Sequence, residues 1–162
     1  MKEKNKFGYA PFSEWKWQRY EGRKSANLDE FIEKNLSCSF FVGTDSQVVS
    51  RATVFTTALI AYNVGKGGTI IVHTDKAERM DQGQLRQRLM METFRSLETA
   101  WYLDTKIPTE SVISIHLDVN DSLTYKSNKY RDELVGLVMG QNFKPLTKPN
   151  SWASSSVADS RC

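Results

Sequence analysis

Cysteine, proline and histidine are scarce in this chain, which has two, four and two of them among 162 residues. Cys38 and Cys162 give neither the paired spacing of a zinc site nor a disulfide framework, so we expect a reducing, cytoplasmic setting. No apolar run approaches the roughly 18–20 residues of a membrane span, and no apolar stretch follows the charged N-terminus as in a secretion signal. We therefore expect a protein that is neither secreted nor bound to a membrane.

Size and charge narrow the class of protein. With 40% hydrophobic residues, a chain of 162 residues can form one domain with a real core and has little left for a second. The formal net charge of +3 is mild and does not by itself demand nucleic acid, although it is compatible with a locally basic face. We expect residues 25–162 to form this domain and residues 1–24 to form a basic, aromatic arm.

The arm carries large rings among its basic residues. They are Phe7, Tyr9, Phe12, Trp15, Trp17 and Tyr20. Such rings can stack on nucleic-acid bases. A row of exposed rings would also make a sticky patch on the surface. We therefore expect the rings to pack the arm onto the domain, with base stacking as the alternative.

Residue periodicity predicts an α/β fold. The expected strands are 39–45, 52–64, 69–74, 111–120 and 143–149, and the expected helices are 28–36, 81–104 and 129–141. The first three strands follow one another with turn signals between them, which predicts a meander. Helices and strands then alternate. We therefore expect a five-stranded mixed sheet flanked by helices.

Two of the predicted strands end in an aspartate. Asp45 follows the apolar run in FFVGTDSQ, and Asp118 stands near the end of SVISIHLDVN. If the fourth strand returns beside the first through a right-handed crossover, the two carboxylates lie at the same end of strands about 4.8 Å apart. Like charges so close raise each other's pKa unless a cation lies between them. Oxygen ligands suit Mg²⁺ or Mn²⁺ better than zinc. The alternative is that these are ordinary turn residues.

Three segments carry a resemblance to a known family. FVGTDSQ, HLDVN about seventy residues later, and KPNSWASSSVADS near the end resemble the YkuK-like family of predicted ribonuclease H-related nucleases. The resemblance runs from about residue 36 to residue 162, and the last segment is its most distinctive part. It implies a ribonuclease H-like fold and a metal-dependent nuclease that hydrolyses RNA or DNA with two ions, Mg²⁺ or Mn²⁺.

The resemblance also implies a set of acidic ligands. In the superfamily, acids from the first strand, the fourth strand and the last helix hold the metals, which corresponds here to Asp45, Asp118 and Asp159. A helix glutamate often joins them. Glu92 and Glu98 lie at opposite edges of the apolar face of the helix at 81–104, so both cannot reach one point. We prefer Glu92, because it lies nearer the start of the helix, where the superfamily usually places this ligand.

Other residues near these acids have less specific patterns. The basic residues that are candidate phosphate contacts are Lys126, Lys129, Arg131, Lys144 and Lys148. His116 shares a strand face with Asp118, where it could assist proton transfer or simply fill the site. Nucleic acid is the expected partner, and a homodimer is compatible with the small chain. The alternative function is a non-catalytic module that binds nucleic acid or protein on the same fold.

Overall fold

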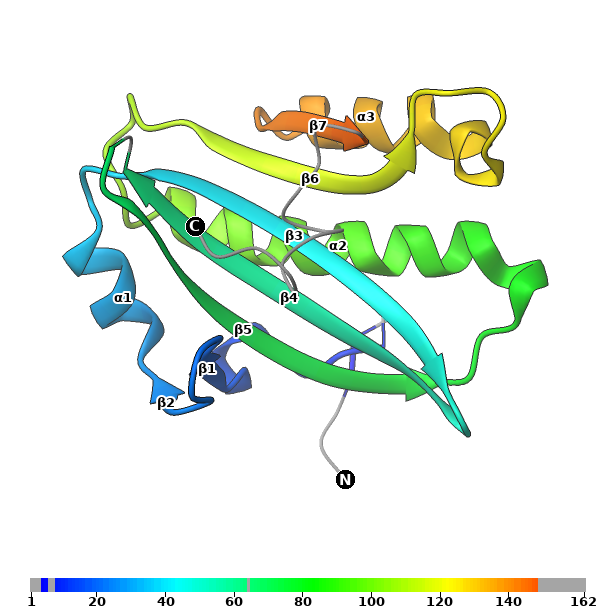
Figure 1. Cartoon of the computed structure of the whole chain (residues 1–162), viewed down its shortest axis with the longest axis horizontal. Coiled ribbons are helices and arrows are strands. Elements are labelled where there is room, and N and C mark those ends of the chain that lie inside the picture. The colour runs from blue at the N-terminus through cyan, green and yellow to red at the C-terminus, as the bar shows by residue number, and fades with distance from the viewer. Residues whose placement is uncertain (1–3, 6–7, 64, 149–162) are drawn as a thin grey trace.

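A computed structural model of the protein describes residues 4–5, 8–63 and 65–148. These residues are organised around one mixed β-sheet. Within these residues the sheet has seven strands in the order β2-β1-β5-β4-β3-β6-β7 (Figure 1). The strands are β1 (Trp17–Arg19), β2 (Ser25–Ala26), β3 (Ser39–Val49), β4 (Ala52–Asn63), β5 (Gly67–Glu78), β6 (Ile113–Asn120) and β7 (Lys144–Lys148). The helices are α1 (Leu28–Lys34), α2 (Leu85–Asp104) and α3 (Arg131–Gly140), with 3₁₀ turns at Phe12–Glu14, Gln82–Gln84 and Lys126–Tyr130.

The sheet contains the five predicted strands and two more. Strands β3, β4 and β5 form the expected antiparallel meander, and β6 is parallel to both β3 and β7. The mixed α/β class is therefore confirmed, but the prediction of five strands was wrong. The additional strands β1 and β2 span only three and two residues, too short to show an alternating pattern. They form because β1 pairs with the edge of β5 and then with β2.

Helix α2 makes the crossover that brings β6 beside β3. It runs along one face of the sheet between the end of β5 and the start of β6 (Figure 1). Its buried apolar residues, among them Leu89, Leu97 and Leu103, belong to the main core. The capping box of Asp81 and Gln84 starts the 3₁₀ turn that leads into the helix. In the part of the chain that the structure describes, no helix is both long and apolar enough to span a membrane.

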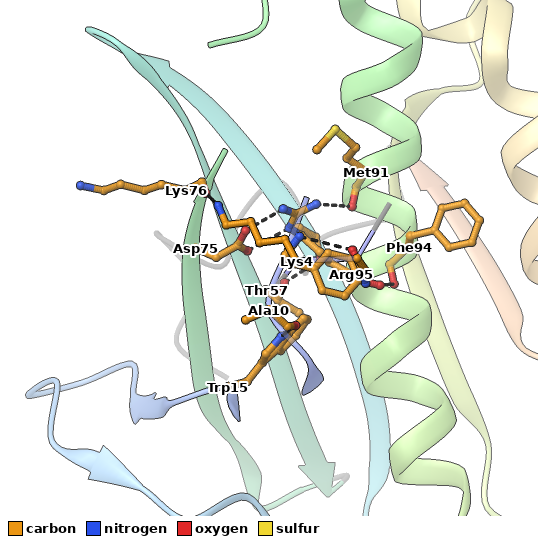
Figure 2. Close-up of polar contacts among 12 residues, drawn as sticks. Lys4, Ala10, Trp15, Thr57, Asp75, Lys76, Met91, Phe94 and Arg95 are labelled. Atoms are coloured by element: carbon orange, nitrogen blue, oxygen red, sulfur yellow. Dashed lines mark hydrogen bonds and ion pairs between the residues drawn. The ribbon is translucent and has the colours of Figure 1, made fainter. Parts of the chain in front are cut away.

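A buried ion pair fixes α2 on the sheet. Arg95 is fully buried, and its Nε and Nη2 donate to the two carboxylate oxygens of Asp75 on β5 at 2.8 and 2.6 Å (Figure 2). Its Nη1 donates to the Met91 carbonyl oxygen at 3.1 Å. The guanidinium carbon also lies 3.8 Å from the centre of the Phe55 ring and 4.8 Å from that of Tyr9. A bidentate pair of this kind sets both the distance and the direction between helix and strand.

The N-terminal residues are part of the same core. Tyr9, Trp15 and Trp17 are buried, as expected for rings that pack onto the sheet. Trp15 stacks on His73 with 4.3 Å between ring centres, and the Tyr9 hydroxyl donates to Glu98 Oε2 at 3.1 Å. Phe7 lies outside the described residues. The division into an arm over 1–24 and a domain over 25–162 stays a prediction.

The ion pair leads to a stability prediction. Asp75→Asn leaves the buried Arg95 guanidinium without a balancing charge, so we expect the free energy of unfolding to fall by about 3 kcal/mol or more. Urea unfolding followed by circular dichroism measures this fall. Glu30→Gln is the control, because it breaks an exposed pair with Lys34 on α1. An equally small fall in both variants would contradict the structural role of the pair.

Candidate functional site

The parallel pairing of β3 with β6 places two aspartates side by side. The paired residues run from Phe40↔Ile113 to Gly43↔His116. Asp45 and Asp118 each come two residues after the last of these pairs, so they stand at equivalent positions on the two strands. Both carboxylates are half-buried. The parallel arrangement considered from the sequence thus brings both acids together just beyond the paired segment, but β3 does not end at Asp45 as predicted, because its pairing with β4 continues to Val49.

A bulge in β6 interrupts the regular pairing with β7 in the segment that carries Asp118. His116 pairs with Leu146 of β7, and the next pair is Asn120 with Lys148. Four residues of β6 therefore advance against two of β7. Bulges of this kind interrupt the ladder and redirect a side chain. Here the interruption spans the residues on either side of Asp118.

Glu92 of α2 completes an acidic cluster with the two aspartates. One carboxylate oxygen from each of Asp45, Glu92 and Asp118 lies within 4.8 Å of the others. Glu92 is only 4% exposed, and Ser46 Oγ donates to its Oε2 at 3.0 Å. Its second oxygen, Oε1, is buried and accepts no hydrogen bond from any described residue. The cluster therefore holds a carboxylate oxygen that is aimed inward and has no donor.

Side-chain hydroxyl groups hold α2 against β3 in the position that lets Glu92 reach the two aspartates. Thr44 precedes Asp45, and its Oγ1 lies 2.8 Å from Ser96 Oγ on α2 and 3.1 Å from Thr57 Oγ1 on β4. Ser96 is one helical turn after Glu92. The contacts of Ser46 and Thr44 thus tie two successive turns of the helix to β3.

Burial and like charge make the carboxylates reluctant to ionise. Burial and then the charge of Asp118 raise the pKa of Asp45 from 3.8 to about 6. Burial, Asp118 and Asp45 raise the pKa of Glu92 well above its ordinary value. An arrangement that holds acids in this state costs stability until a cation offsets their charge.

Lys148 at the end of β7 supplies part of that positive charge. Its Nζ forms an ion pair with Asp118 Oδ1, and both side chains are largely shielded from solvent. Burial alone would lower the pKa of Lys148, but the hydrogen bond to Asp118 and the charges of Asp118, Asp45 and Glu92 raise it. The charge of Arg88, four residues before Glu92 on α2, also favours the charged form of Glu92, but the pKa of Glu92 stays raised, so these cations compensate the cluster only in part.

The cluster fits a hard divalent cation. Its donors are all carboxylate oxygens, one of which is buried and has no hydrogen-bond donor among the described residues. Hard divalent cations prefer oxygen ligands, whereas structural zinc sites favour cysteine and histidine. The donor set therefore fits a divalent metal of the oxygen-preferring class.

The other residues singled out in the sequence lie in different surroundings. Glu98 faces Tyr9 rather than the aspartates. His116 is buried with its ring 5.3 Å from that of Phe41, and burial lowers its pKa to about 4, so it is neutral at pH 7. Arg131 is paired with Asp121 and Asp132. Lys126, Lys129 and Lys144 are exposed, and Asp159 lies outside the described residues.

Comparison with known proteins shows the family of this chain. A family model described as Ribonuclease H-like matches residues 25–162. The chain belongs to the ribonuclease H-like family. It is also similar to the uncharacterized protein YkuK of Bacillus subtilis (strain 168), with 27% identity over 148 residues that cover 82% of this chain and 84% of the relative. No solved structure matches it significantly.

Two residues that contact the acidic cluster were not recognised from sequence. Ser46 falls just outside the strand predicted over 39–45, whereas β3 continues to Val49 and carries Ser46 to the helix. Lys148 was one of several candidate phosphate contacts. Only its pairing with Asn120 across the bulge shows that it meets Asp118.

The mutual repulsion leads to a prediction for the metal-free protein. We expect Asp45→Asn to raise the free energy of unfolding at pH 7.5 in EDTA, by an amount on the order of 1 kcal/mol, because it removes a partly buried, repelled charge. The pKa of Asp45 is raised in the folded protein, so its ionisation costs stability as pH rises from about 4 through 6. The gain should therefore vanish near pH 4. Glu33→Gln on the exposed side of α1 is the control, and a loss of stability in Asp45→Asn at pH 7.5 would contradict the prediction.

Proposed function

We propose that this protein is a divalent-metal-dependent nuclease that hydrolyses phosphodiester bonds of RNA or DNA. The observation that carries the proposal is the cluster of Asp45, Glu92 and Asp118, whose carboxylate oxygens lie within 4.8 Å of one another in a ribonuclease H-like chain. Acids gathered at this cost to stability are typical of functional sites. The two aspartates lie just beyond the paired segment of neighbouring parallel strands, on the side toward which both strands run.

Each residue has a separate role in this proposal. Asp45 is the proposed bridging ligand, and Glu92 and Asp118 are the other two proposed ligands within the described residues. Asp159 is the proposed fourth ligand. Bound Mg²⁺ or Mn²⁺, two ions in this proposal, would lower the pKa of the attacking water and stabilise the charge on the leaving oxygen. Ser46 orients Glu92 through its hydrogen bond, so the ligand is held before the substrate arrives.

The cluster needs no protein nucleophile for this chemistry. Among the described residues no cysteine belongs to it, and the buried, neutral His116 packs against Phe41. The work of the chain is therefore to hold three carboxylates in place and to keep them partly shielded from water. Stabilisation by preorganised charge is strongest in such a shielded site.

The two helix glutamates give a matched test of the proposal. We expect Glu92→Gln and Asp45→Asn to lower the cleavage rate by roughly 100-fold or more, because even residues that only orient metal ligands contribute 10–100-fold. Glu98→Gln should cleave nearly as fast as wild type, since Glu98 meets Tyr9 instead of the cluster. The assay uses labelled single-stranded, duplex and hybrid oligonucleotides with Mg²⁺ or Mn²⁺, and the products are separated on a gel.

The outcomes of this test separate the candidate functions. Equal losses in Glu92→Gln and Glu98→Gln would show that the site is misassigned. Metal binding without cleavage of any substrate by wild type would refute the nuclease and favour a binding module on the same fold. Cleavage that survives in Asp45→Asn would place the catalytic centre elsewhere.

Lys148 leads to a prediction about metal affinity. A cation that takes Asp118 as a ligand must weaken the ion pair between Asp118 and Lys148. We therefore expect Lys148→Met to bind Mn²⁺ about fivefold more tightly than wild type, as for the loss of a partly exposed ion pair. Isothermal titration calorimetry measures this change. Lys144→Met on the same strand is the control, and weaker binding in Lys148→Met would show that the ammonium supports the metal instead of competing with it.

A further inference from the structure

A groove is formed by residues of α2 and of the segment after β6, the two elements that also carry Glu92 and Asp118. It has a volume of about 530 Å³ and lies between the start of α2 and the segment that follows β6. Its lining includes Leu85, Leu123, Tyr125, Lys126, Lys129 and Tyr130. These residues combine apolar side chains, aromatic rings and positive charge on one surface.

Two of the apolar side chains at this groove are unusually exposed. Leu123 is 89% exposed, more than any other large hydrophobic residue in the described part of the chain, and Tyr125 is 58% exposed. They stand two positions apart in one loop. Adjacent exposed apolar residues at a groove are costly to leave in water and mark a binding surface. Neither is required by the core, because both lie outside its two clusters.

The loop that carries these residues is fixed to the strand of the acidic cluster. Asn128 Nδ2 donates to the Asn120 carbonyl oxygen at 2.9 Å, and the Asn120 amide donates to Ser127 Oγ at 3.1 Å. The Ser122 amide donates to Asn120 Oδ1 at 2.9 Å. Asn120 is two residues beyond Asp118. The loop that carries Leu123 and Tyr125 is thus anchored at the end of β6. Ligand binding to this loop therefore costs little entropy for ordering the loop.

Positive charge runs from the groove toward the cluster. Lys126 and Lys129 are exposed at the groove. On α2, Arg88 lies between Leu85 in the groove and Glu92 in the cluster, and its buried Nε makes no hydrogen bond with any described residue. Leu85 and Glu92 are seven residues apart, or about 10 Å along the helix. One extended strand of nucleic acid is long enough to meet both.

We propose that this groove binds an unpaired nucleotide of the substrate, with its base against Tyr125 and Leu123 and its phosphates near Lys126 and Lys129. The inference deepens the proposed function and rests on it for the cleavage step. Bases in a duplex stack on their neighbours, so a ring platform is available only to a base that is unpaired. Stacking on an aromatic ring is also tolerant of base identity. The substrate class is therefore nucleic acid with a single-stranded segment next to the cut.

Binding and cleavage are measured separately to test this. Fluorescence anisotropy with labelled single-stranded and duplex oligonucleotides is recorded in EDTA in an Asp45→Asn background, where substrate is not consumed. We expect Tyr125→Ala to weaken single-strand binding by roughly tenfold, the usual contribution of one stacked base, and to leave duplex binding unchanged. Tyr125→Phe is the matched control and should bind as tightly as its parent.

Loss of the two lysines should change the salt dependence of binding, whereas loss of the Tyr125 ring should not. We expect the double variant Lys126→Ala/Lys129→Ala to reduce the dependence of log affinity on log salt by about 1.4 for single strands, because two phosphate contacts are lost. Tyr125→Ala should leave this salt slope unchanged. A ring that acted only by supporting the fold of the loop would change both quantities together.

The outcomes distinguish this inference from the nuclease proposal. Unchanged single-strand binding in Tyr125→Ala, equal losses on single strand and duplex, or no binding to either would overturn the inference, whether or not wild type cleaves. Tyr125-dependent binding of single strands by a protein that cleaves nothing would support the groove and refute the nuclease. Selective loss of both binding and cleavage of single strands in Tyr125→Ala would support both.

Discussion

The ion pair between Arg95 and Asp75 decides where helix α2 lies on the sheet, and the site follows from that position. The pair joins the helix to β5, while the hydroxyl contacts of Thr44 and Ser46 join it to β3. Glu92 can meet the aspartates only if both sets of contacts hold. The fixed guanidinium also lies against Tyr9, so the N-terminal residues pack on the helix that carries part of the site. The same contacts of α2 therefore stabilise the fold and position the site.

The acidic cluster works against the stability of the fold that positions it. Its three carboxylates repel one another, and burial adds to the cost of charging them. Lys148 and Arg88 offset part of this cost, but the pKa values of Asp45 and Glu92 remain raised. A fully neutralised cluster would be more stable and would have no use for a cation. The incomplete compensation is the physical sign that separates a binding site from a buried structural ion pair such as that of Arg95.

Sequence patterns predicted the parts of the structure that depend on local periodicity. The meander and the long helix follow from alternation and helical spacing. The parallel return of β6 was a condition drawn from the right-handed crossover rule, and the structure contains this parallel pairing, which brings Asp45 and Asp118 together. Strands β1 and β2 were not predicted, because β1 forms by pairing with the edge of β5 and β2 by pairing with β1. The contact of Lys148 with Asp118 was not predicted, because it depends on a bulge. The register shift between two strands far apart in the chain cannot be read from a single sequence. The choice between Glu92 and Glu98 needed the direction of each side chain, which a helical wheel gives only approximately.

The bulge in β6 has a consequence for how freely this chain can vary over evolution. Among the described residues β7 is the outermost strand beside β6, and its two-residue step from Leu146 to Lys148 matches a four-residue step in β6. Removing or adding one residue in the step of β7 would turn Lys148 to the opposite face of the sheet, and the same change in the step of β6 would shift Asp118 relative to the pair of Asn120 with Lys148. Relatives that keep the acidic cluster with this lysine should therefore preserve the lengths of both segments even where their sequences diverge.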